Sequence, residues 1–179
     1  MDIGYVDREY PLTQRKPSQR DVRYSLKDAL LRFWYRFVFP NLSRIRENPN
    51  AAFENLIAPQ LDSFYGACFE RLCRESLAQV YLKEAANVST QVGEYWRNKE
   101  IQIDVVGIRS DNWIDLGECK WGAVTSAPVL VSELEAKVER YPNPTNATLG
   151  RVLFTRRSLQ MKGSSVRHFS LEDMFGLFS

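Results

Sequence analysis

Three charged residues on two neighbouring predicted strands have the types and spacing that phosphodiester chemistry needs. Asp104 lies in the alternating run 101–106, and Glu118 and Lys120 lie in the later run 114–121. Because side chains alternate across a strand, Glu118 and Lys120 share one face of it. The short turn between the runs makes them antiparallel neighbours, so we expect Asp104 to lie near Glu118.

Strand alternation also predicts how the first run is oriented. Gln102 and Asp104 fall on one face of the strand, whereas Ile101, Ile103 and Val105 fall on the other. We therefore expect those three apolar residues to share a face that Asp104 does not.

Two carboxylates that are forced together repel each other unless a divalent cation or a proton lies between them. Magnesium suits this need, because it prefers oxygen ligands and binds through one or two carboxylates plus a substrate phosphate. A lysine beside the metal could position or deprotonate a water, or stabilise charge on the phosphate. Glu70, on the helix before the sheet, could add a third carboxylate. The simpler interpretation is that Asp104 and Glu118 face water or pair with Lys120.

The elements that must position these residues follow from hydrophobic periodicity after residue 60. Helical spacing predicts one long helix, and period-two alternation predicts three tightly connected antiparallel strands, followed by a helix, a strand and a serine-capped helix. The ranges are 61–84, 91–97, 100–109, 112–121, 126–141, 151–155 and from Ser170 onward. A strand reached through a helical crossover favours an α/β fold: a mixed sheet in the order α-β-β-β-α-β-α with helices on both faces.

The first sixty residues show a different pattern. Short strands at 4–11 and 22–25 predict a β-ribbon. Ser25 stands where an N-cap is expected, with Asp28 as the capping-box acid, before an apolar helix at 26–39.

Composition limits the class of protein. The 179 residues are 44% hydrophobic and 26% charged, which excludes collagen, coiled coils and wholesale disorder. We divide the chain into an N-terminal ribbon and helical segment, 1–60, and a sheet domain, 61–179. Three cysteines are too few for a disulfide framework, so we expect reduced thiols and a cytoplasmic protein.

Hydropathy argues against a membrane protein, and the charge distribution is uneven. No secretory signal is visible, and the most apolar segment, 29–39, is interrupted by Arg32 and Arg36. The formal net charge is only +2, but residues 1–46 carry ten Lys/Arg against five Asp/Glu. This basic excess either follows phosphates or an acidic partner, or forms a solvated face.

The same residues resemble known families. Asp104 followed by Glu118-Cys119-Lys120, with a helix before and a helix and strand after, resembles the PD-(D/E)xK nuclease superfamily. Five stretches look like the C-terminal DUF234 domain of archaeal-type P-loop ATPases: 24–28, 31–37, 69–73, 102–106 and 117–121. This second resemblance covers nearly the whole chain.

The resemblance implies a restriction-endonuclease-like fold and hydrolysis of DNA that depends on Mg²⁺ or Mn²⁺. It matches Asp104 and Glu118 to the metal-binding acids, Lys120 to the catalytic lysine and Glu70 to the acid of the first core helix. The acid usual two residues before the aspartate is Gln102 here. The ribbon would be the remnant of a winged helix. Because the chain has no G-x-x-x-x-G-K-[ST] motif, we expect it not to hydrolyse ATP.

Two functions from different classes are compatible with these features. One is a metal-dependent DNA endonuclease, expected from the resemblance to act as a homodimer because each active site cuts one strand. The other is a catalytically silent module that binds DNA or docks onto a partner ATPase through the aromatic helix at 26–39.

Several other side chains have two interpretations. Four tryptophans either stack on bases or pack against the core: Trp34, Trp96, Trp113 and Trp121. Three cations either contact a phosphate backbone or are simply solvated: Lys137, Arg156 and Arg157. We assign no role to His168, and we expect Cys119 to pack under a helix rather than act as a nucleophile.

Overall fold

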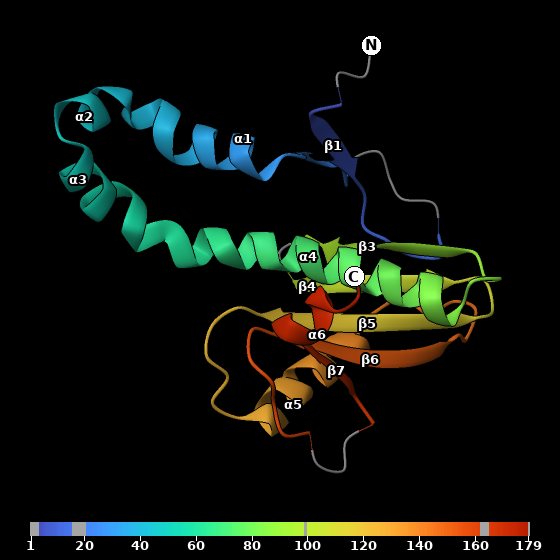
Figure 1. Cartoon of the computed structure of the whole chain (residues 1–179). Helices are drawn as coiled ribbons and strands as arrows, with labels where there is room; N and C mark the ends of the chain where they lie inside the picture. The colour runs from blue at the N-terminus through green and yellow to red at the C-terminus, as the bar shows by residue number, and fades with distance from the viewer. Residues whose placement is uncertain (1–3, 16–20, 99, 162–164, 179) are drawn as a thin grey trace.

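The structure is a computed structural model that describes residues 4–15, 21–98, 100–161 and 165–178. A helical arm projects from a five-stranded sheet, and one long helix belongs to both (Figure 1). The parts of the predicted segments 1–60 and 61–179 that fall on the other positions lie outside the described residues. The division into two domains stays a prediction.

The sheet is mixed, as expected, and its strand order is β3-β4-β5-β6-β7. The strands are β3 (Thr90–Arg97), β4 (Ile101–Arg109), β5 (Trp113–Lys120), β6 (Thr148–Thr155) and β7 (Arg167–Ser170). The first three strands are antiparallel neighbours, which confirms that prediction, and β5, β6 and β7 run parallel. The prediction missed β7, because its four residues show no apolar run. The order from residue 61 is therefore α-β-β-β-α-β-β-α.

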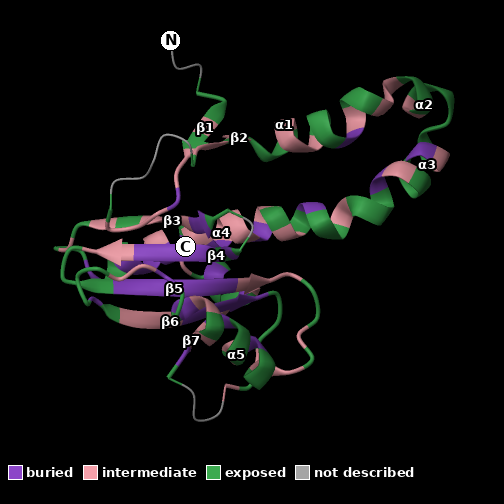
Figure 2. Cartoon of the chain, turned by 180° about the vertical axis from the view of Figure 1, so that it is seen from behind, coloured by how far each residue is buried: buried purple, intermediate pink, exposed green. Residues whose placement is uncertain are grey.

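Helices cover both faces of the sheet, as predicted. Helix α4 (Leu61–Glu84) has the predicted bounds and buries Phe69, Cys73 and Leu77 against one face. Helix α5 (Ala127–Val138) buries its predicted stripe of Leu130, Leu134 and Val138 against the other face. The central strands are buried between these layers (Figure 2). The short helix α6 (Leu171–Phe175) begins with the predicted Ser170 cap.

The arm is a pair of interrupted helices that lie side by side. The outgoing half consists of α1 (Ala29–Phe33), a π-helical turn (Trp34–Val38), a 3₁₀ turn (Phe39–Asn41) and α2 (Leu42–Glu47). The returning half consists of α3 (Pro49–Ala52), a π-helical turn (Phe53–Ile57), a 3₁₀ turn (Ala58–Gln60) and then α4. Phe37, Ile57 and Phe64 form a small apolar core between the two halves.

The predicted ribbon is present, but the predicted start of the following helix is wrong. Strand β1 (Val6–Glu9) pairs antiparallel with β2 (Arg23–Leu26), so Leu26 belongs to a strand. The Ser25 hydroxyl donates to the Glu9 carboxylate and caps no helix. Asp28 is the N-cap, because its carboxylate accepts the Leu31 N–H at 2.9 Å. Ribbon pairing therefore delays the helix to Ala29.

A β-bulge in β4 overturns the predicted alternation around Asp104. Gly93 pairs with Val106 and Tyr95 pairs with Ile103, so three steps along β4 oppose two along β3. The extra residue shifts the faces of the strand. As a result, Ile103 packs on the α5 side and Val105 packs on the α4 side. The expectation that Ile101, Ile103 and Val105 share a face is wrong because strict alternation ignores the bulge.

Two further features concern the cysteines, expected to be reduced thiols, and the hydropathy of the helices. Cys68, Cys73 and Cys119 are free. Within the described ranges, no helix combines the length and hydropathy required to span a bilayer.

Candidate functional site

The bulge places Asp104 where β4 and β5 separate. Their ladder ends at the pair Val105–Gly117, one residue before Asp104 would oppose Glu118. Asp104 Oδ2 accepts the Cys119 N–H at 3.0 Å, in place of a backbone partner from β4. The Asp104 side chain is buried, at 8% exposure. The predicted proximity of Asp104 to Glu118 therefore arises at a splayed strand pair rather than in a regular ladder.

Glu118 is a buried carboxylate held by two lysines. The residue is 4% exposed. Lys120 Nζ lies 3.0 Å from its Oε1, and Lys137 Nζ of α5 donates to its Oε2. Lys120 also approaches Glu133 at 3.6 Å. A buried charge is costly without a partner, so this pairing explains how Glu118 remains inside the molecule.

Lys137 is the site residue that sequence analysis placed elsewhere, as a phosphate contact or a solvated cation. Its position in the sequence indicates this role, because Lys137 directly precedes Val138 of the apolar stripe that faces the sheet. A lysine at the border of a core-facing stripe can extend its ammonium group to a carboxylate on the sheet.

Lys120 is held in its charged form. Burial lowers the pKa of Lys120, but the hydrogen bond to Glu118 and the charge of that carboxylate outweigh burial and raise it above the ordinary value. A protonated lysine cannot accept a proton from water. An ammonium group at this position can stabilise negative charge.

Glu70 lies on α4, close enough to sense the other two carboxylates. Burial, and then the charge of Asp104, raise the pKa of Glu70 to about 7. Burial, and then the charge of Glu118, raise the pKa of Asp104 to about 6. One turn after Glu70, Arg74 donates to the Asp104 carbonyl at 3.0 Å, which fixes the bulge. The structure thus brings Asp104, Glu118, Lys120 and Glu70 to one region.

The side chains at this site offer a limited donor set for a divalent ion. In the described part of the chain, no three or more His, Cys, Asp or Glu side chains are grouped closely enough to hold a metal. Mg²⁺ can bind through one or two carboxylates and retain waters, so the chemistry of these two buried side chains is compatible with that ion. Asp104 and Glu118 are the residues that fit, and Glu70 as a third ligand stays a prediction.

The environments of Cys119 and His168 give neither side chain a catalytic role. Cys119 lies on the α4 side of β5, where burial raises the pKa of its thiol far above the usual value. His168 Nε2 lies 2.7 Å from the Thr155 hydroxyl, which itself donates to the Arg157 carbonyl. The imidazole therefore donates to Thr155 and activates no nucleophile.

These features define a mixed α/β protein with a buried acid–acid–lysine site at the end of its central strands. The family model for DUF234, described as "Archaea bacterial proteins of unknown function", matches residues 34–135. The chain belongs to this family. The matched range contains Glu70, Asp104, Glu118 and Lys120, and it ends before Lys137.

One curated relative is an uncharacterized protein of Methanocaldococcus jannaschii. It is 27% identical over 123 residues, which is 68% of this chain and 27% of the relative. The chain therefore spans about a quarter of the length of that relative. No solved structure matches the chain.

Proposed function

We propose that this chain is a metal-dependent phosphodiesterase that cleaves DNA as an endonuclease of the PD-(D/E)xK type. The observation that carries the proposal is the pair of buried carboxylates, Asp104 and Glu118, beside an ammonium group where two strands separate. Such carboxylates favour a divalent cation, and such an ammonium group favours a negatively charged substrate.

Each side chain has a role that follows from its contacts. Asp104 and Glu118 would hold Mg²⁺ or Mn²⁺, with Glu70 behind them. When bound, the ion would polarise a phosphoryl oxygen and lower the pKa of a water. Lys120 stabilises negative charge on the phosphate. Lys137 positions Glu118, and Arg74 positions Asp104 through its backbone.

The first test measures cleavage of supercoiled, linear and branched DNA with Mg²⁺ or Mn²⁺. Asp104→Asn and Lys120→Ala should each lower the rate by at least about a hundredfold, because each removes a group that stabilises the transition state. Lys83→Ala, an exposed lysine at the end of α4, is the matched control and should cleave normally. Equal rates in all variants would overturn the proposal.

Metal binding is measured separately by calorimetry on the wild type and on Glu118→Gln. The wild type should bind Mg²⁺ or Mn²⁺, and the variant should lose most of that affinity. An exposed acid at the far end of α4, Glu84, supplies the control Glu84→Gln.

A catalytically silent docking module is the second candidate. It is favoured by the two lysines on Glu118, which satisfy this carboxylate without any metal. It is also favoured by the exposed aromatic side chains of the arm: Trp34, Tyr35, Phe39 and Phe53. This candidate predicts stable capture of DNA or of a partner ATPase without cleavage. The proposal further includes a cytoplasmic location. It also includes a homodimer, whose mass light scattering in solution would measure.

A further inference from the structure

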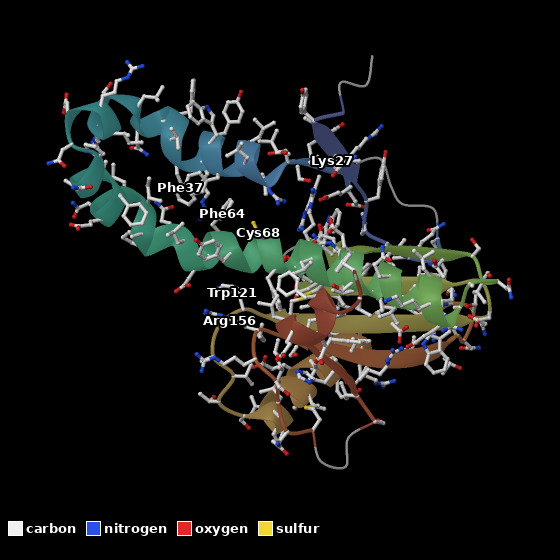
Figure 3. The ribbon with its side chains drawn as sticks, viewed as in Figure 1. Lys27, Phe37, Phe64, Cys68, Trp121 and Arg156 are labelled. Atoms are coloured by element: carbon white, nitrogen blue, oxygen red, sulfur yellow. The ribbon has the colours of Figure 1, made fainter. Side chains whose placement is uncertain are left out.

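A cluster of aromatic and cationic side chains lies directly after the proposed catalytic lysine. Trp121 follows Lys120 in sequence, and its ring meets Tyr65 of α4 with centroids 5.6 Å apart. The Arg156 guanidinium lies over the Trp121 ring, 4.5 Å from its centroid. We call Tyr65, Trp121 and Arg156 the stacking platform. Figure 3 shows Trp121 and Arg156 together at the end of the sheet nearest the arm.

The stacking platform is tied to the site by backbone contact. The Arg156 N–H donates to the Lys120 carbonyl at 3.1 Å, so the positions of Arg156 and Lys120 are coupled. Phe69 supports Trp121 from the core side, with ring centroids 5.7 Å apart, and Asp62 accepts from the indole Nε1 at 3.4 Å. The Lys120 side chain pairs with Glu118 and Glu133 on the α5 side of the sheet. Trp121 instead packs against α4, so a ligand on the stacking platform would lie at the end of β5 on its α4 side.

Core packing accounts for only part of this arrangement. Tyr65 is 42% exposed, and Arg156 is also exposed. Among the described residues, no carboxylate forms an ion pair with Arg156. Its guanidinium thus lies over an indole without a charge partner. Exposed rings and planar cations are the groups on which unpaired bases stack.

We propose that the stacking platform binds an unpaired base of a DNA strand that passes the end of β5. Bases inside a duplex are already stacked and cannot present a face to Trp121 or Arg156. The preferred substrate would therefore be DNA with a single-stranded segment at a branch or overhang. The cleavage part of this inference rests on the proposed function, whereas the binding part does not.

The binding test is carried out in EDTA, by fluorescence anisotropy, on the full chain. The probes are an oligothymidylate, a blunt duplex, and a duplex with a single-stranded overhang. The wild type should bind the overhang substrate about tenfold more tightly than the blunt duplex, the value expected for stacking of one base. Arg156→Ala and Tyr65→Ala should lose most of this preference. Both side chains are exposed, so neither substitution should disturb the packing of the core.

Matched controls separate stacking from charge. Arg157→Ala removes a neighbouring exposed cation that does not cover Trp121. This substitution should weaken binding to the overhang substrate and to the blunt duplex equally. Tyr24→Ala removes an exposed ring of β2 and should change neither affinity. Equal binding of overhang and blunt duplex by the wild type would overturn the inference. The same loss of preference in Arg156→Ala and Arg157→Ala would also overturn it.

Cleavage of the same substrates is measured with Mg²⁺ as a separate readout. Cleavage of overhang and blunt duplex at equal rates would overturn the inference and leave the nuclease proposal intact. Preferential binding that depends on the stacking platform, without cleavage, would overturn the nuclease proposal and support the inference.

Discussion

Glu118 shows how individual residues define the site. A carboxylate that is 4% exposed needs strong partners, and here Lys120 from its own strand and Lys137 from α5 supply them. The strand alone supplies one cation, so tertiary contact completes the ion-pair network.

Lys137→Met should destabilise the metal-free protein. It removes one of the two cations on a buried carboxylate, and the loss should be about 2 kcal/mol because Lys120 remains. Urea denaturation in EDTA measures this change. Lys83→Met should unfold like the wild type, and an unchanged midpoint for Lys137→Met would show that Glu118 does not need the second lysine.

The protonation of Glu70 should make stability depend on pH. Its pKa is raised from 4.5 to about 7 in the folded chain, so its proton stabilises the fold. This contribution is fully present below pH 4.5 and is lost as the pH rises through about 7.

The wild type should therefore lose roughly 2 kcal/mol of unfolding free energy between pH 5 and pH 8, and Glu70→Gln should not show this loss. Melting curves in EDTA at both pH values test this expectation. Glu75→Gln, which changes an exposed acid of the same helix, serves as the control. If the stability of the wild type and of Glu70→Gln changed with pH in the same way, the predicted role of Glu70 would be contradicted.

At the scale of elements, a buried polar network fastens α4 to the sheet. The Tyr81 hydroxyl donates to Asp115 Oδ2 at 2.6 Å, and Trp113 Nε1 donates to Asp115 Oδ1 at 3.0 Å. Burial, and then the Asp115 charge, raise the pKa of Tyr81. Gly150 on β6 leaves the space that the Asp115 carboxylate fills.

Gly150→Ala should destabilise the protein by about 3 kcal/mol, because its Cβ would collide with Asp115 Oδ1 and lie 3.0 Å from Trp113 Nε1. Chemical denaturation measures this loss. Gly122→Ala is the control, since nothing lies within 4 Å of the added Cβ. Equal stability of the two variants would show that the network tolerates displacement.

At the scale of the whole molecule, Arg71 joins the ribbon to the helix that carries Glu70. Arg71 donates to the Lys27 carbonyl at 2.7 Å, and it contacts Asp7 at 3.1 Å and Ser25 at 3.2 Å. Arg71 therefore helps to hold the ribbon over α4, while Arg23 of β2 pairs with Glu94 of β3.

Arg71→Met should release the ribbon while the sheet remains folded. Thermolysin should cut between residues 4 and 28 about tenfold faster than in the wild type, because local opening then costs less free energy. Melting of the sheet, followed by circular dichroism, should change by only a few degrees. Arg44→Met, an exposed arginine of the arm, should leave the cleavage rate unchanged.

Much of the architecture could be predicted from local sequence patterns. Helix α4 has the predicted bounds because its apolar stripe and the alternation that follows it are strong signals. The stripe of α5, the Ser170 cap and the three antiparallel strands were also confirmed. These features depend on neighbours a few residues apart, which is the range that periodicity describes.

Tertiary structure alone decided the remaining features. The bulge at Asp104 depends on how β3 pairs with β4, and the start of α1 depends on how β1 pairs with β2. Lys137 reaches Glu118 only because α5 packs across β5. Local sequence patterns identify which residue types can do chemistry and which strands carry them. Packing between distant segments decided their burial, their charge partners and their orientation, because those depend on contacts that no local pattern encodes.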